Sequence, residues 1–296
     1  MQIRNAVILA AGRGTRLLPS TKAQPKEMLP VGRKPIVQYV AEELAASGIE
    51  SVLFVTGRRK RAIEDHFDED VELTEHLRAA GKTDLIDELR FEQSGVAFFY
   101  TRQSRQLGTG HAIGCAREFA GGEPFVVAMG DAIITGGTGR TLVQRMMDAY
   151  DQTDGGLVIA FREVQQEDTS RYGVALPGSD GDVFEVRNLV EKPPPGTAPS
   201  NLAVAARYIL PPTVFEYIDR TPPAANGEIQ NTDTFRLMIR DGVKVVGVKL
   251  TGTERRCDVG NFGSYCRAFI DFALADEEIG PELQAYLENK LRAARP

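Results

Sequence analysis

The chain of 296 residues carries a formal net charge of −6, with hydrophobic residues at 42% and charged residues at 26%. This composition is ordinary for a globular protein, and the apolar runs are too short to span a bilayer, so no membrane partner is expected. The negative charge argues against a nucleic-acid partner held by bulk electrostatics. Three cysteines without a CxxC pair, and a start without signal-peptide features, together favour the reducing cytoplasm.

The first half of the chain alternates buried strands with helices. Short apolar runs predict strands at residues 6–11, 51–56, 96–101, 125–129 and 156–163. Apolar residues at helical spacing predict helices at residues 35–47, 60–67, 110–119 and 141–150. The strongly charged segment 69–93 predicts a helical excursion on the surface. Strands separated by helices indicate an α/β fold whose mixed, mostly parallel sheet has helices on both faces.

From about Tyr172 the pattern changes, and prolines separate shorter elements. Strands are expected at residues 172–176, 183–191, 202–210 and 243–250, and helices at residues 232–241, 262–275 and 281–293. We interpret this half as a small mixed α+β extension over the carboxyl ends of the first strands, where open α/β sheets bind ligands. The prediction is a single domain over residues 1–296, with a core at 1–165 and an extension at 166–296.

The strongest local signal is the loop that follows the first strand. Gly12 and Gly14, which follow Ala10 and Ala11, let the backbone of this loop approach a ligand closely. The same loop carries three cationic side chains, Arg13, Arg16 and Lys26. Exposed N–H groups together with cations suit the oxygens of a triphosphate. The loop is neither a dinucleotide fingerprint, since residue 17 is Leu, nor a P-loop, since no GK[ST] follows at the required spacing.

The whole pattern from Gly12 to Pro30 reads GxGTRxxPxTxxxPKxxLP, which is the signature of sugar-1-phosphate nucleotidyltransferases. Further matching stretches lie at residues 56–67, 102–112, 130–131, 171–174, 189–193, 198–203, 227–233 and 258–261. Over nearly its whole length the chain resembles bacterial UTP–glucose-1-phosphate uridylyltransferases. This resemblance implies a Rossmann-like nucleotidyltransferase fold and a homodimer or homotetramer. It also implies that the core binds the nucleotide and the extension binds the sugar phosphate.

The resemblance implies a role for each matching residue. It implies contacts to UTP from Ala10, Ala11, Gly12, Gly14, Gln103, Gly108 and Asp131, and catalytic roles for Arg16, Lys26 and Lys192. It implies contacts to the sugar phosphate from Gly173, Glu191 and Lys192, with Asp131 and Asp258 holding one Mg²⁺. For Glu228 two roles stay open, a contact to the sugar or a place in a subunit interface. The Gln103 amide offers a donor and an acceptor, which matches the paired edge of uracil or thymine.

The implied reaction transfers a uridylyl group from UTP to glucose 1-phosphate, giving UDP-glucose and pyrophosphate. Three alternatives stay open at this point. A thymidylyltransferase making dTDP-glucose would read the same base edge, and a silent relative could bind nucleotide sugars without catalysis. Asp258 could instead cap the helix near Phe262, which is a common role for Asp. Ala132 and the segment 252–264 depart from the family pattern, and the departures in 252–264 lie beside Asp258.

Overall fold

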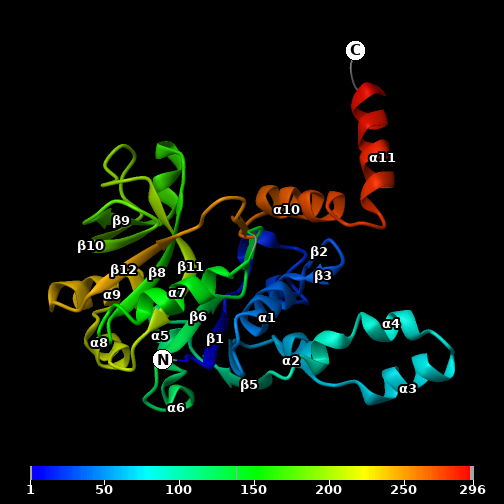
Figure 1. Cartoon of the computed structure of the whole chain (residues 1–296), viewed down its shortest axis with the longest axis horizontal. Helices are drawn as coiled ribbons and strands as arrows, with labels where there is room; N and C mark the ends of the chain where they lie inside the picture. Colours follow the sequence, from blue (N-terminus) through cyan, green and yellow to red (C-terminus); the bar gives the residue numbers. More distant parts are fainter. Residues whose placement is uncertain (1, 138, 294–296) are drawn as a thin grey trace.

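The computed structural model describes residues 2–137 and 139–293 and is built around a nine-stranded sheet (Figure 1). The strand order is β5-β4-β1-β6-β11-β8-β12-β10-β9. The strands are β1 (Asn5–Ala10), β4 (Ser51–Thr56), β5 (Ala97–Arg102), β6 (Phe125–Met129), β8 (Leu157–Glu163), β9 (Gly173–Pro177), β10 (Val183–Glu191), β11 (Leu202–Leu210) and β12 (Val245–Lys249). Two small antiparallel pairs join β2 (Pro30–Val31) to β3 (Lys34–Pro35), and β7 (Ala132–Thr135) to β13 (Arg255–Asp258).

The sheet is mixed but mostly parallel. Strands β5, β4, β1 and β6 pair in parallel, and so do β8 and β12. Only β10 and β11 run against the other strands of this sheet among the described residues. The predicted α/β fold class is therefore confirmed.

The second half of the chain occupies a different place from the one expected. Most of its strands continue the sheet, and β11 inserts between β6 and β8, whereas the expectation placed this half over the strand ends. The physical reason lies in residues 202–210, which are mostly apolar on both sides of the strand, apart from Arg207, and are almost completely buried. Such a strand is stable only where elements cover both of its faces, which is the middle of the sheet.

Helices cover both faces of the sheet. On one face pack α1 (Ile36–Ala46), α2 (Arg61–Phe67) and α7 (Leu142–Tyr150). On the other pack α5 (Thr109–Gly114), α6 (Arg117–Ala120), α8 (Val214–Arg220) and α9 (Asn231–Arg240). Alternate residues of β1 divide between these two cores, with Ile8 in the first and Val7 and Leu9 in the second. This division is the period of two that a strand imposes on its side chains.

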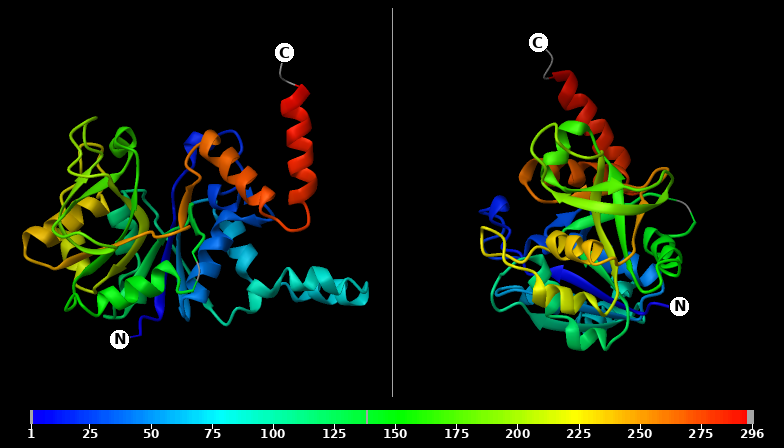
Figure 2. Two further views of the ribbon diagram at one scale, coloured as in Figure 1. Left: turned by 45° about the horizontal axis from the view of Figure 1, so that its top comes forward. Right: turned by 90° about the vertical axis from the view of Figure 1, so that its left-hand side faces the viewer.

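Two helical segments project from this body (Figures 1 and 2). The first contains α3 (Val71–Ala79), α4 (Thr83–Asp87) and the 3₁₀ turn η3 (Arg90–Gln93), as the charged segment predicted. The second contains α10 (Phe262–Leu274) and the C-terminal α11 (Gly280–Ala293). Three further 3₁₀ turns lie at η1 (Thr15–Leu17), η2 (Lys26–Met28) and η4 (Gln166–Arg171). Across residues 2–137 and 139–293, no helix is both long and apolar enough to cross a membrane.

Candidate active site

The loop after β1 folds back on itself around the side chain of Lys26. Gly14 adopts a left-handed φ of 67°, and its carbonyl accepts a hydrogen bond of 2.7 Å from the Thr21 hydroxyl. A Cβ built on Gly12 would lie 3.3 Å from Lys26 Nζ, so the ammonium group lies directly against the glycine backbone. Buried Leu17 anchors the turn, while Arg16 stays exposed. The result is a loop that presents backbone and cations on one side.

Lys26 forms an ion pair with Asp131, which lies two residues after the end of β6. Burial alone would lower the pKa of Lys26, but the neighbouring carboxylates of Asp131 and Glu27 outweigh it and raise that pKa. Burial would also raise the pKa of Asp131, but Lys26 outweighs burial and lowers it. The pair is therefore fully ionised and brings opposite charges to the same point of the site.

A second ion pair lies beneath the first. Lys60 Nζ approaches Glu27 Oε2 at 2.5 Å, and both side chains are almost completely buried. Burial raises the pKa of Glu27, which Lys60 and Lys26 partly oppose. Glu27 lies in η2 beside Lys26, while Lys60 precedes α2, so this pair ties the loop to the end of β4. It holds Lys26 in place from below.

Two neighbouring cavities open at this point. The larger has a volume of about 1040 Å³ and the smaller about 630 Å³, and Arg16, Lys26 and Asp131 line both. The larger cavity is lined by eight basic side chains against five acidic ones: Arg16, Lys26, Arg162, Arg171, Lys192, Arg255, Arg256 and Arg267 against Asp131, Asp168, Glu191, Asp258 and Asp271. An excess of positive charge in a concave site attracts anionic ligands. The arrangement therefore suits two anions that meet at Lys26.

The smaller cavity is the nucleotide side of the prediction. Ala11, Gly12, Gln103 and Gly108, four of the residues assigned to the nucleotide, line this cavity. Its lining within the described chain includes neither Ala10 nor Gly14. The Ala10 side chain packs in the core of the sheet, and Gly14 forms the turn of the loop, so both residues shape the cavity from behind.

Gln103 is buried, and its amide is already oriented. Its Nε2 lies 2.9 Å from the Gly108 carbonyl and 3.0 Å from His111 Nδ1. Both N–H groups therefore have acceptors within the protein, and Oε1 is left available as an acceptor. Gly108 has a φ of 95°, and a Cβ there would lie 2.4 Å from the Ile229 carbonyl oxygen. Only glycine fits this approach, which holds the turn against residue 229.

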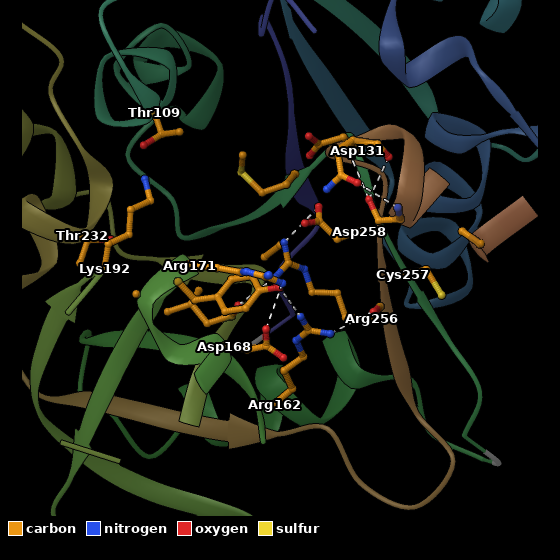
Figure 3. Close-up of a pocket in the computed structure, with 18 of the residues that line it drawn as sticks. Thr109, Asp131, Arg162, Asp168, Arg171, Lys192, Thr232, Arg256, Cys257 and Asp258 are labelled. Atoms are coloured by element: carbon orange, nitrogen blue, oxygen red, sulfur yellow. Dashed lines mark hydrogen bonds and ion pairs between the residues drawn. The ribbon is translucent and has the colours of Figure 1, made fainter. Parts of the chain in front are cut away.

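Gly173, Glu191 and Lys192, the residues assigned to the sugar phosphate, line the larger cavity together, where Figure 3 labels Lys192. Glu191 accepts a hydrogen bond of 2.8 Å from the Thr232 hydroxyl, which fixes one carboxylate oxygen. Lys192 has a left-handed φ of 44°, which is rare for a non-glycine residue. This conformation lets two adjacent residues at the end of β10 face the same cavity, although neighbours on a strand normally point to opposite sides.

Glu228 lies apart from the other predicted sugar ligands. It lines the smaller cavity with Gln103, whereas Gly173, Glu191 and Lys192 line the larger one. Its carboxylate accepts hydrogen bonds from Asn226 at 3.0 Å and Gln230 at 2.7 Å. The loop of residues 224–230 packs against the Gly108 turn, which places Glu228 on the nucleotide side.

Asp131 and Asp258 come from neighbouring segments and line the larger cavity together (Figure 3). Asp258 ends β13 opposite Ala132, and the Val259 N–H donates to the Asp131 carbonyl at 3.3 Å. Asp258 does not cap the following helix, because Asn261 is the N-cap of α10 and forms a reciprocal pair with Ser264. The helix-capping alternative for Asp258 is therefore wrong, and the departures at residues 262–264 preserve a well-formed helix start.

Two carboxylates on adjacent segments fit a divalent cation with oxygen ligands. Across the described residues, no group of three or more His, Cys, Asp or Glu side chains is placed to hold a metal ion. Mg²⁺ commonly takes one or two protein carboxylates and completes its shell with phosphate oxygens and waters. The donor set of Asp131 and Asp258 therefore suits Mg²⁺ delivered with a phosphorylated substrate.

Arg162, Tyr172 and Arg256 are among the residues of the larger cavity that were missed from the sequence. Both guanidinium groups lie over the Tyr172 ring, at 5.1 Å and 5.5 Å from its centroid. A signal for Arg256 was present, since it lies two residues before Asp258 on one strand and so shares its face. Arg162 carries no such signal, because it reaches the site only through the pairing of β8 within the sheet.

Comparison with known proteins identifies what this chain is similar to. The family model described as nucleotidyl transferase matches residues 5–273. A curated UTP–glucose-1-phosphate uridylyltransferase from Staphylococcus epidermidis is 44% identical over 288 residues, covering 97% of this chain and 98% of the relative. The resemblance predicted from the sequence motifs is thus confirmed.

Two solved structures share the fold. A UTP-bound UGPase from Acinetobacter baumannii matches with a TM-score of 0.89 and 32% identity, covering 97% of this chain and 99% of that one. A UDP-glucose pyrophosphorylase complexed with UDP-glucose matches with a TM-score of 0.83 and 35% identity, covering 93% of this chain and 100% of that one. The predicted nucleotidyltransferase fold is confirmed by these matches.

Proposed function

Because the chain belongs to the nucleotidyl transferase family, we propose that it transfers a uridylyl group from UTP to glucose 1-phosphate, releasing UDP-glucose and pyrophosphate. The observation that carries this proposal is the pair of cavities that share Arg16, Lys26 and Asp131. One cavity holds the base-reading Gln103 and the other holds Lys192, so two phosphorylated substrates would meet at the shared cations. The names of the similar proteins support the same reaction.

The chemistry is an in-line displacement at the α-phosphorus of UTP. A phosphate oxygen of glucose 1-phosphate attacks, the bond to pyrophosphate breaks, and the leaving group departs with its negative charge. The attacking oxygen is already an anion, so the residues need not remove a proton. Their task is to hold two polyanions together, and orientation of this kind can supply about 7–11 kcal/mol.

Each predicted residue has a defined task in this reaction. Arg16 and Lys26 neutralise the triphosphate, with Lys26 placed against the Gly12 backbone. Lys192 binds the phosphate of the sugar, and Glu191 and Gly173 face the sugar itself. Gln103 Oε1 accepts the N3–H of uracil, because its own N–H groups are occupied by Gly108 and His111. These side chains are positioned before the substrates arrive, and their charges stabilise the negative charge of the transition state.

We assign Asp131 and Asp258 as the protein ligands of Mg²⁺. When bound, this ion would supply charge neutralisation and Lewis-acid polarisation of the phosphate oxygens. Lys26 forms an ion pair with Asp131, and this pair keeps the carboxylate ionised. The same lysine then serves the phosphates that arrive with the substrate.

The assembly and location follow as further parts of the proposal. Exposed apolar side chains on α10 and α11, among them Phe269, Ile270 and Leu291, support a homodimer or homotetramer. The three free cysteines support a reducing compartment, the cytoplasm. No contact to nucleic acid or membrane is part of the proposal.

Pyrophosphate release measured with UTP, glucose 1-phosphate and Mg²⁺ tests the function. We expect turnover with UTP to exceed turnover with dTTP. A preference for dTTP would identify the thymidylyltransferase instead, since Gln103 reads an edge that both bases share. Binding of UDP-glucose without any pyrophosphate release would identify the non-catalytic regulator. A panel of sugar 1-phosphates in the same assay determines the sugar.

A further inference from the structure

A pair of arginines forms the floor of the larger cavity. Arg162 comes from β8 and Arg256 from β13, and both guanidinium groups stack on the Tyr172 ring. Arg162 Nη1 also donates to the backbone carbonyl of Arg256 at 3.2 Å. Figure 3 shows Arg162 and Arg256 side by side, with Asp258 next to Arg256 and Lys192 across the cavity. Two like charges are thus held at close range by a single aromatic ring.

The positive charge of this pair is poorly compensated within the protein. The acceptors of Arg162 are the neutral Tyr172 hydroxyl, at 2.9 Å, and a backbone carbonyl. Arg256 has a weak carbonyl contact to Val204 at 3.4 Å and one ion pair, with Asp258 at 3.5 Å. The Nε atoms of both arginines are buried and find no acceptor among the described residues. Natural proteins seldom leave such groups unsatisfied without a ligand or ion nearby.

The electrostatics of the arginine pair also favours an anionic ligand. Burial lowers the pKa of Arg162, and the neighbouring Arg256 lowers it further. The carboxylate beside Arg256 is Asp258, which is also the proposed ligand of the metal ion. A cation held by Asp258 would leave less of that carboxylate's charge to balance the arginines. An anion between the two guanidinium groups would relieve their repulsion, and arginine forks match phosphate oxygens well.

The position of the arginine pair indicates which anionic substrate it contacts. Arg162 and Arg256 line the larger cavity with Gly173, Glu191 and Lys192, on the sugar-phosphate side. The lining of the smaller cavity, taken over the described residues, contains neither arginine. Most of the residues assigned to the base and the triphosphate line that smaller cavity. The arginine pair therefore lies away from the proposed nucleotide position.

We propose that Arg162 and Arg256 form a second phosphate-binding subsite, which with Lys192 holds the phosphate of the incoming sugar 1-phosphate. The ligand class is a phosphate monoester dianion, and the same subsite takes the sugar-linked phosphate of the nucleotide-sugar product in the reverse reaction. This inference rests on the proposed function and adds to it a specific pair of binding residues. Tyr172 is the positioning residue that keeps both guanidinium groups in the floor of the cavity.

The test measures KM for each substrate separately in Arg162→Gln and Arg256→Gln. Each substitution should raise KM for glucose 1-phosphate about tenfold or more, as expected for a hydrogen bond to a charged group. KM for UTP should change less than about twofold, because the nucleotide contacts remain. In the reverse reaction, KM for UDP-glucose should rise while KM for pyrophosphate stays unchanged. Inorganic phosphate should compete with glucose 1-phosphate more weakly in both variants.

The controls separate binding from a structural role. Arg187→Gln removes an exposed arginine of β10 and should leave every KM at its wild-type value. Tyr172→Phe keeps the ring but loses the hydroxyl, so it should change KM for glucose 1-phosphate less than either arginine variant. If a Gln variant does not fold, Arg162→Lys and Arg256→Lys are measured instead, because lysine keeps the charge and lacks the planar guanidinium group.

Two results would overturn the inference while leaving the function intact. An unchanged KM for glucose 1-phosphate in folded variants would show that the pair does not bind this phosphate. An equal rise in KM for UTP and glucose 1-phosphate would assign the arginines a general structural role. Failure of the proposed function itself appears differently, as absence of pyrophosphate release by the wild-type enzyme.

Discussion

Asp131 lies at the point where the two cavities meet, and it is paired with Lys26. Its carboxylate is the more buried of the two proposed magnesium ligands, with 16% of the side chain exposed against 33% for Asp258. Removing it would leave Lys26 without its partner and take away one ligand of the ion. A single substitution would therefore affect both the proposed metal site and Lys26.

We predict that Asp131→Ala lowers kcat by roughly 10²–10³-fold or more, which is typical of losing a preorganised electrostatic group. Steady-state pyrophosphate release at ordinary Mg²⁺ concentrations measures this effect. Asp148→Ala, which removes an exposed acid paired with Arg140, is the matched control and should retain wild-type activity. Full activity of Asp131→Ala would rule out its assignment as a metal ligand.

Gly108 shows how one backbone position determines the base-reading side. A Cβ at this position would lie 2.4 Å from the Ile229 carbonyl oxygen and would force the two segments apart. We predict that Gly108→Ala raises KM for UTP more than KM for glucose 1-phosphate, because Gln103 hydrogen-bonds to the Gly108 carbonyl. The two KM values, measured in the same assay, check this expectation.

The matched control is Gly122→Ala, at a left-handed φ of 81° with open space around its position. Ala at residue 122 has the backbone strain of a left-handed conformation, which costs about 1–2 kcal/mol, but meets no neighbouring atom. Gly108→Ala should lower the free energy of unfolding by more than this control does. Equal losses in the two variants would mean that the contact with residue 229 is unimportant.

At the scale of elements, α2 attaches the projecting segment of α3, α4 and η3 to the body. His66 of α2 stacks on Phe91 of η3 with ring centroids 4.7 Å apart, and its Nε2 lies 3.1 Å from Gln38 Oε1 on α1. Burial lowers the pKa of His66, and the only opposing charge resolved nearby among the described residues is Glu42. The imidazole is therefore kept neutral in the folded protein.

This lowered pKa predicts a loss of stability on acidification. Above the unfolded-state pKa of about 6.5 both states are neutral, and His66 contributes no pH dependence. As the pH falls below that value, the unfolded chain binds a proton that the folded protein resists, so the free energy of unfolding decreases. The decrease ends once the pH is below the folded-state pKa.

Denaturant unfolding of the wild type and of His66→Gln between pH 8 and pH 5 measures this dependence. The stability advantage of the wild type over the variant should shrink as the pH falls through about 6.5. A constant difference across this range would contradict the prediction. The reason for the choice of glutamine is that it keeps a hydrogen-bonding group but does not titrate.

At the scale of the whole molecule, a buried ion pair joins the two halves of the chain. Arg207 of β11 is completely buried, and its Nη2 lies 2.6 Å from Glu43 Oε2 on α1. The same arginine donates to the carbonyls of Ala206 and Ala132 at 3.0 Å and 2.9 Å. A strand from the second half is thus fixed to a helix from the first.

We predict that Glu43→Ala lowers the free energy of unfolding by about 3–5 kcal/mol, because it leaves a buried guanidinium without a counterion. The double variant Glu43→Leu with Arg207→Met should lose less, since it buries no unpaired charge. Glu50→Ala removes an exposed acid 3.6 Å from Arg4 and should cost less than about 1 kcal/mol. Denaturant unfolding of the four proteins compares these values, and a Glu43→Ala loss no larger than the Glu50→Ala loss would contradict the prediction.

The sequence alone determined most elements, the α/β class and the family, and it supplied the candidates for the main site residues. These follow from local information, since strand and helix periods are set by neighbouring residues and the loop from Gly12 to Pro30 is a continuous motif. Lys26, Gln103, Asp131 and Lys192 could be identified because each lies in such a motif.

Only the tertiary structure decided how distant segments meet. The position of β11 between β6 and β8 depends on which strands pair, and no local spacing specifies strand neighbours. The Lys26–Asp131 pair spans 105 residues of sequence, and the Arg207–Glu43 pair spans 164. Arg162 and Arg256 meet over Tyr172 for the same reason. Their shared charge exists only once the sheet has assembled, and it is this feature that assigns the floor of the cavity to a phosphate.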